Sequence, residues 1–160
     1  MSKKLVTYFS ASGVTAGVSK KLAEAARADL YEIKPEVTYS REDLDWKDEN
    51  SRSSVEMKDK SSRPAIADKN ANIKDYDVIF VGFPIWWYVA PTIINTFLES
   101  YDFAEKTIVL FATSGGSGFG KTVDGLKGSV SDSTIIKEGK ILNGTQSVNE
   151  LKEWVDSLGV

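Results

Sequence analysis

The segment Asp77-Val-Ile-Phe-Val-Gly-Phe-Pro-Ile-Trp-Trp-Tyr-Val-Ala-Pro91 lies near the middle of the chain. Its first part, Val78 to Val81, contains no polar residue that would face solvent. Such a run is typical of a strand that is covered on both faces, as in the centre of a parallel sheet. We expect the strand to break at Gly82-Phe83-Pro84, because proline cannot continue a central strand, and Pro91 to lie in the first turn of a helix.

The loop after this predicted strand is rich in large apolar side chains, namely Ile85, Trp86, Trp87 and Tyr88. Exposing four such side chains is costly unless something flat and apolar covers them. Packing of the two tryptophans against each other in the core explains the loop alone equally well. The loop therefore indicates either a core cluster or one wall of a site for a flat ligand.

Length and composition limit the function of the chain. Its 160 residues are expected to form a single domain over residues 1–160, and the net charge of −3 argues against a nucleic-acid-binding protein. The sequence has no cysteine and no histidine, which excludes thiol nucleophiles, Ser-His-Asp hydrolysis and the usual zinc sites. We predict no catalytic residue and no metal site. Without a signal peptide or an apolar run of about 18 residues, the expected location is cytoplasmic, away from membranes.

Apolar runs and helical patterns alternate along the chain. The predicted strands are Lys4–Phe9, Leu30–Ile33, Asp77–Phe83, Thr107–Ala112 and Ser133–Ile136, and helical spacing follows at residues 14–25, 94–101, 119–130 and 148–158. Ser147 and Glu150 form a capping box for the last helix. This alternation predicts an α/β fold with a parallel sheet and helices on both faces. In such sheets ligands bind beyond the carboxyl ends of the strands.

The region from Glu36 to Lys69 differs from the rest, with nine acidic and seven basic residues and few large apolar ones. Ser40 and Asp43 predict the cap of a polar helix that runs towards Lys60. Leu44, Trp46, Val55 and Met57 would be its apolar anchors. A mobile, solvated excursion or a lid over the site are the alternatives.

A phosphate site is indicated between the first strand and its helix, where Ser10-Ala-Ser-Gly-Val-Thr15 provides three hydroxyls and a glycine. The unpaired backbone N–H groups and the dipole at a helix N-terminus favour a phosphate monoester there. Helix capping is the structural alternative for one or two of the hydroxyls. Beside a phosphate site, a flat heteroaromatic ring becomes the better explanation of Trp86 and Trp87.

Residues 115–122, Gly-Gly-Ser-Gly-Phe-Gly-Lys-Thr, match the phosphate-binding pattern of P-loop nucleotide hydrolases. These enzymes also need an apolar strand that ends in Asp to hold magnesium, and the sequence offers none. A hydrolase is therefore a remote alternative. The interpretation that we prefer is a close backbone approach of Ser114, Gly115 and Gly116 to the polar edge of a planar ligand.

Taken together, these motifs resemble the flavodoxin superfamily, and specifically its small bacterial flavodoxin-like branch. The resemblance rests on the loops 10–15, 84–87 and 113–116, on Gly139-Lys140 followed by Asn143-Gly144, and on a closing helix with Trp154. It implies a doubly wound, five-stranded parallel sheet in the order 2-1-3-4-5 and one non-covalently bound flavin mononucleotide (FMN).

By similarity, the phosphate would be held by Ser10, Ser12, Gly13, Val14 and Thr15. The flavin ring would be lined by Pro84, Ile85, Trp86 and Trp87 on one side and by Thr113, Ser114, Gly115 and Gly116 on the other. Family members often have Asn where this chain has Val14, which removes one hydrogen bond.

The resemblance implies an FMN-dependent electron-transfer protein that works with a reductase and an acceptor protein, as a monomer or weak dimer. The alternative is an enzyme on the same cofactor, a reductase that passes hydride from NAD(P)H to a quinone or nitro compound. An interaction module that binds no flavin is the third hypothesis.

Overall fold

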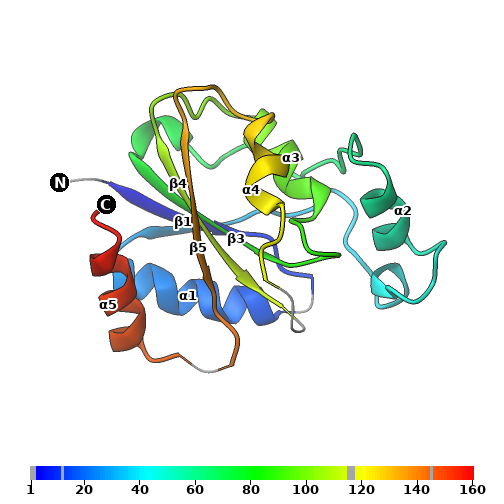
Figure 1. Ribbon diagram of the computed structural model, residues 1–160, viewed down its shortest axis with the longest axis horizontal. Coiled ribbons are helices and arrows are strands. Elements are labelled where there is room, and N and C mark those ends of the chain that lie inside the picture. Colours follow the sequence, from blue (N-terminus) through cyan, green and yellow to red (C-terminus); the bar gives the residue numbers. More distant parts are fainter. Residues whose placement is uncertain (1–2, 12, 115–117, 145) are drawn as a thin grey trace.

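A computed structural model describes residues 3–11, 13–114, 118–144 and 146–160 (Figure 1). The elements follow in the order β1 (Lys4–Tyr8), α1 (Val14–Ala26), β2 (Asp29–Glu32), η1 (Glu42–Leu44), α2 (Arg52–Lys58), η2 (Ile73–Asp75), β3 (Val78–Pro84), α3 (Thr92–Glu99), β4 (Thr107–Thr113), α4 (Thr122–Lys127), β5 (Ile135–Ile141) and α5 (Val148–Ser157). Here η denotes a short 3-10 helix.

The five strands form one parallel sheet in the order β2-β1-β3-β4-β5, which confirms the predicted α/β fold. Helices α1 and α5 cover one face of the sheet, and α3 and α4 cover the other (Figure 1). Alternate residues of each strand enter the two cores, so Phe80 packs on the α1–α5 side and Ile79 and Val81 on the α3–α4 side. Both cores exclude water from the sheet, which is why the middle parts of β3 and β4 are apolar.

Strand β3 spans Val78–Pro84, one residue later at each end than the predicted Asp77–Phe83, and it includes Pro84. Pro84 pairs with Thr113 of β4, and the next N–H, that of Ile85, donates to the carbonyl of Thr113 at 2.8 Å. The backbone nitrogen of Pro84 therefore points away from β4, to the side where β1 has already ended at Tyr8. A proline is tolerated there because no neighbouring strand needs its N–H.

The predicted position of the last strand was wrong, since β5 spans Ile135–Ile141 and not Ser133–Ile136. It is an edge strand, so polar side chains such as Glu138 and Lys140 are exposed and the apolar run is short. The register shifts opposite Leu110, where β5 has one extra residue. Gly139 lies at this bulge because a Cβ there would stand 1.9 Å from the carbonyl oxygen of Leu110.

A continuous helix from Ser40 to Lys60 was also a wrong prediction. The capping box is present, since the backbone N–H of Ser40 donates to Asp43 at 2.9 Å and that of Asp43 donates to Ser40 at 3.1 Å. It opens only the short η1, because the carboxylates of Asp45 and Asp48 then accept from backbone N–H groups two residues on. Ser51 caps the separate helix α2. Of the expected anchors, Trp46 and Val55 are exposed.

The region between β2 and β3 is tied to the domain at several points. Pro35 and Ile66 form an antiparallel bridge that closes the loop between them. The guanidinium of Arg63 pairs with the carboxylate of Glu99 on α3 at 3.0 Å. This region, which we call the insertion (residues 36–72), therefore packs beside α3. Its helix α2 lies on the side away from the sheet (Figure 1).

Candidate functional site

The loops that follow β1, β3 and β4 lie side by side at one edge of the sheet, since all three strands are parallel neighbours. Backbone hydrogen bonds continue past the strand ends, from the N–H of Phe9 to the carbonyl of Gly82 at 2.9 Å and from Ile85 to Thr113 at 2.8 Å. The topology thus brings together the described parts of the three loops that sequence reasoning selected. Ser12, Gly115 and Gly116, which were also predicted to bind the cofactor, lie outside the described residues.

Helix α1 begins at the end of the first of these loops. Gly13 takes a left-handed conformation with φ of 92°, and its N–H donates to the hydroxyl of Ser10 at 3.0 Å. No side chain of the described residues caps this helix, whereas Ser147 caps α5. The first-turn N–H groups of α1 therefore remain available to an anion. Val14, the first residue of the helix, is 58% exposed at this end.

Thr15 and Thr113 connect the first loop to the end of β4. Their hydroxyls lie 2.8 Å apart in a hydrogen bond, and the two residues are only 2% and 5% exposed. The carbonyl of Thr15 accepts from Ser19 at 2.7 Å, within the same helix. These threonines fix the distance between the two loops.

Asn143 joins the site, although sequence reasoning named it only among the residues that carry the family resemblance. Its side-chain oxygen accepts from the N–H of Ser114 at 2.8 Å, and its amide donates to the carbonyl of Ser114 at 2.8 Å. The side-chain amide of Gln146 donates to the backbone carbonyl of Asn143. The ammonium of Lys21 on α1 donates to the backbone carbonyl of Gln146 at 3.2 Å. The chain after β5 thus holds the start of the loop after β4 in place.

The aromatic loop divides into buried and exposed parts. Pro84 is half-buried, and Ile85 is 8% exposed within the α3–α4 core. Trp86 is half-buried and meets Phe9 and Tyr39 edge to face, with ring centroids 5.8 and 5.6 Å away. Trp86 is therefore fixed by other aromatic rings beside the β1 end.

Tyr39, which sequence reasoning did not select, connects Trp86 to the insertion. The guanidinium of Arg52 lies 3.8 Å from the centre of the Tyr39 ring, and the Tyr39 hydroxyl donates to Glu56. Burial, followed by the hydrogen bond to Glu56, raises the pKa of Tyr39 well above its ordinary value. The phenol therefore stays neutral and acts as a structural donor.

Trp87 and Tyr88 form the tip of a tight turn. Trp86 and Val89 exchange two backbone hydrogen bonds of 3.0 and 3.2 Å across it. Both central residues are left-handed, with φ of 49° for Trp87 and 66° for Tyr88, a conformation that such turns usually give to Asn or Gly. Their side chains are 45% and 65% exposed, so neither is packed in the core. Large residues held in strained backbone are found preferentially at functional sites.

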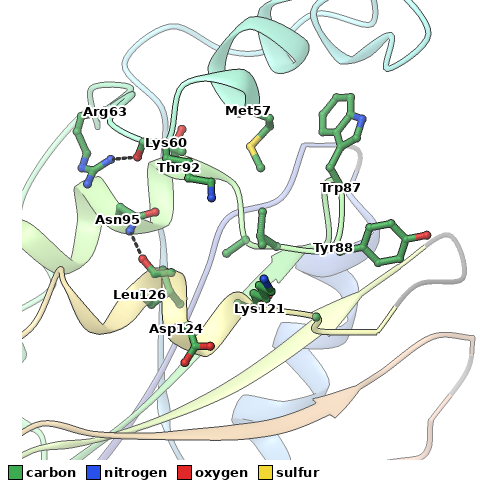
Figure 2. Close-up of a pocket in the computed structure, with 15 residues that line it drawn as sticks. Met57, Lys60, Arg63, Trp87, Tyr88, Thr92, Asn95, Lys121, Asp124 and Leu126 are labelled. Carbon is green, nitrogen blue, oxygen red and sulfur yellow. Dashed lines mark hydrogen bonds between the residues drawn. The ribbon is translucent and has the colours of Figure 1, made fainter.

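Two cavities adjoin these loops. A cavity of about 290 Å³ lies beside Ser10 and is closed by Tyr39 and the end of β2. A larger cavity of about 670 Å³ lies between Trp87, Tyr88, the insertion and helices α3 and α4 (Figure 2). Of the predicted cofactor residues, Ser10 lines the first cavity and Trp87 the second; the other described ones line neither.

The described residues hold no group of three or more acidic, histidine or cysteine side chains placed to ligate a metal ion. Among the helices in the described ranges, none combines the length and apolar character that crossing a membrane requires.

Comparison with known proteins adds to this geometry. The family model for flavodoxin matches residues 3–158. The chain belongs to the flavodoxin family. Among solved structures, this flavodoxin-family chain is similar to a presumed flavoprotein from Bacteroides eggerthii, with 49% identity over 100% of this chain and 99% of the other and a TM-score of 0.92.

A second presumed flavoprotein, from Bacteroides uniformis, is 48% identical over 97% of this chain and 98% of the other, with a TM-score of 0.90. A flavoprotein from Lactobacillus acidophilus, solved in complex with FMN, shares the flavodoxin fold at 24% identity, covering 97% and 99% of the two chains with a TM-score of 0.67. Among curated proteins, no significant match was found.

Proposed function

We propose that this protein binds FMN non-covalently at the carboxyl ends of β1, β3 and β4 and serves as an electron-transfer protein. The observation that carries the proposal is the N-terminus of α1 behind Gly13, which no side chain of the described residues caps, in a chain of the flavodoxin family. The fold shared with a flavoprotein that was solved with FMN further supports this choice of ligand.

The donors at the first loop fit a phosphate group. The first-turn N–H groups of α1 have no acceptor within the described residues, and the helix dipole adds roughly half a positive charge. The hydroxyl of Ser10 lies beside them and can donate to a phosphate while it accepts from Gly13. Backbone donors of this kind bind a phosphate monoester without any lysine or arginine.

The other two loops fit a flat ring. Trp86, fixed by Phe9 and Tyr39, would support it on one side, and the backbone after Thr113, held through Asn143, would meet its polar edge. Bound FMN supplies one- or two-electron transfer, and the protein sets its potential and its exposure to water. A reductase and an acceptor protein would then be the partners, and no side chain of this chain needs to act as an acid or base.

The direct test is a titration of the flavin-free protein with FMN, followed by visible absorption and flavin fluorescence. We expect shifted flavin bands and quenched fluorescence at one FMN per chain. Riboflavin, which lacks the phosphate, should bind at least about 100-fold more weakly, because charge-assisted hydrogen bonds contribute about 1.5–3 kcal/mol each. A protein that leaves the flavin spectrum unchanged would instead support an interaction module without flavin.

Two variants separate the two ends of the ligand. Val14→Asn restores a side-chain donor next to the phosphate and should tighten FMN binding several-fold without changing riboflavin binding, since one hydrogen bond contributes about 1 kcal/mol. Trp86→Ala should weaken the binding of both flavins, because a stacked aromatic pair contributes about 0.5–1.5 kcal/mol beyond burial. Trp46→Ala is the control, since Trp46 is 67% exposed on the insertion.

A second candidate function is an FMN-dependent reductase for quinones or nitro compounds. The specific observation in its favour is the large cavity lined by Trp87 and by Met57 and Lys60 of the insertion, which could admit a substrate. The assay is steady-state oxidation of NADH or NADPH by the purified FMN-loaded protein. Turnover without an added reductase would select the enzyme, and its absence favours the electron carrier.

A further inference from the structure

The 670 Å³ cavity has the size of a small-molecule site, for which roughly 300–1,000 Å³ is typical. It lies on the α3–α4 side of the turn at Trp87 and Tyr88. None of the described residues of loop 10–15, and neither Thr113 nor Ser114, lines it. The cavity is therefore separate from the phosphate end of the predicted flavin site and needs its own explanation.

Its walls are held by a chain of polar contacts. The buried amide of Asn95 donates to the carbonyl of Gly125 at 3.1 Å and to the hydroxyl of Ser129 at 2.9 Å. Ser129 donates to Glu99 at 2.6 Å, and Glu99 pairs with Arg63 of the insertion. Since these contacts join α3, the α4 region and the insertion, the cavity is formed before any ligand arrives.

The lining is mostly apolar, with Met57, Val89 and Leu126 among the wall residues and the indole of Trp87 at its edge. Figure 2 shows Met57 reaching from α2 into the space beside Trp87. The left-handed backbone at Trp87 and Tyr88 is what holds this aromatic edge away from the core. A flat apolar molecule fits such walls, because aromatic side chains and methionine contact it with large, adaptable surfaces.

The charged groups of the lining are mainly positive, although the chain as a whole carries −3. Lys60 reaches the space from the insertion and Lys121 from the start of α4, on its opposite side (Figure 2). Neither ammonium has a hydrogen bond or ion pair within the part of the chain that the structure describes, whereas Arg63 is paired with Glu99. Asp124 also lines the cavity, but its carboxylate points away from the space between the two lysines (Figure 2).

Thr92 adds an unpaired polar atom to the same wall. The residue is 7% exposed, and its hydroxyl has no hydrogen-bond partner among the described residues. Buried hydroxyls are nearly always paired. This oxygen is itself shielded from solvent, so it lies behind the cavity surface and does not face a ligand there.

We propose that this cavity binds a small molecule with a flat apolar body and one anionic group, and that Lys60 and Lys121 recognise the anion. The site goes beyond the proposed function and does not depend on FMN being bound. If the protein proves to be a reductase, the molecule bound here would be of the class that exchanges electrons with it.

The probe for the test is 8-anilinonaphthalene-1-sulfonate, a flat apolar anion whose fluorescence rises in apolar sites. Its neutral counterpart is N-phenyl-1-naphthylamine, which has the same rings without the sulfonate. We expect one site per chain in the flavin-free protein. Lys60→Met and Lys121→Met should each weaken the sulfonate about fivefold and leave the neutral probe unchanged, in keeping with one exposed charge contact.

Two further variants locate the probe. Gly125→Phe should weaken both probes, because Gly125 lines the cavity and a side chain added there meets open space. Lys152→Met on α5 removes an equal charge far from the cavity and should change neither. Equal losses in Lys152→Met and Lys60→Met, or full binding in Gly125→Phe, would overturn the proposal.

Equilibrium dialysis with saturating FMN then separates the two sites. Unchanged binding of the sulfonate in the presence of FMN supports a distinct cavity, and complete displacement by FMN overturns it. If FMN does not bind at all, the proposed function fails while the lysine and Gly125 results still decide the fate of the cavity site.

Discussion

The hydroxyl oxygens of Thr15 and Thr113 lie 2.8 Å apart, although the two residues are 98 positions apart in the chain. The bond joins the first turn of α1 to the end of β4 and is shielded from water. It therefore sets the spacing between the phosphate loop and the loop that would meet the flavin's polar edge. An exposed hydrogen bond, in competition with water, would not fix this spacing.

The effects of removing these two hydroxyls are not expected to add. Thr15→Val and Thr113→Val should each lower the free energy of unfolding by about 1–3 kcal/mol, because each leaves a buried hydroxyl without its partner. The double variant should cost clearly less than the sum of the two. Urea unfolding of the four proteins measures this coupling, and additive losses would show that the bond contributes nothing of its own.

The turn at Trp87 and Tyr88 allows a test of strain against function. Tyr88→Gly should raise the free energy of unfolding by about 0.5–1 kcal/mol, because glycine takes a left-handed conformation without steric cost. Glu105→Gly is the matched control, since Glu105 is also exposed and left-handed, with φ of 64°.

Only Tyr88→Gly should also weaken binding of the flavin or of the sulfonate probe. Thermal unfolding and the two titrations together decide the outcome. If both variants are stabilised and both bind normally, the strain at Tyr88 serves no binding function.

Local signals predicted most of the sheet. The apolar runs at Val78–Val81 and at Thr107–Ala112 gave two central strands, since a strand buried on both faces must be apolar throughout. The edge strand was misplaced because an exposed edge tolerates Lys137, Glu138 and Lys140. The polar helix failed for a similar reason, since carboxylates such as that of Asp45 compete for backbone N–H groups.

Contacts between distant residues were not predictable from local patterns. The loop motifs selected Ser114 and Trp86, but nothing in the sequence pairs Ser114 with Asn143, 29 positions away, or sets Tyr39 against Trp86. The large cavity was missed for the same reason, since its lysines come from the insertion and from α4. The roles of the predicted flavin residues remain predictions.

The link between the insertion and α3 should depend on pH. The hydrogen bond from Arg63 holds the pKa of Glu99 below its ordinary value of 4.5, with a further contribution from Ser129. A carboxyl with a lowered pKa in the folded state stabilises the protein fully above pH 4.5 and loses that contribution as pH falls through the lowered value. Glu99→Gln should therefore destabilise at pH 7 by up to about 1 kcal/mol, in line with a partly exposed pair.

Urea unfolding between pH 7 and pH 3 tests this prediction. The difference between wild type and Glu99→Gln should shrink below pH 4.5, and it should be small at every pH in an Arg63→Met background. A difference that stays constant with pH would show that Glu99 acts through shape and not through charge.

The redox potential gives the most direct test of how the site would work. Aromatic rings such as Trp86 and the net charge of −3 both disfavour added negative charge on a bound flavin. The potential of the second one-electron step, which forms the fully reduced anion, should therefore lie below that of free flavin, by about 60 mV for each 1.4 kcal/mol of this penalty. Potentiometric titration of the FMN-loaded protein measures it. Trp86→Ala, which admits water, should move the potential back towards the free value, whereas Trp46→Ala should not. A wild-type potential at or above that of free flavin would contradict this account of the site.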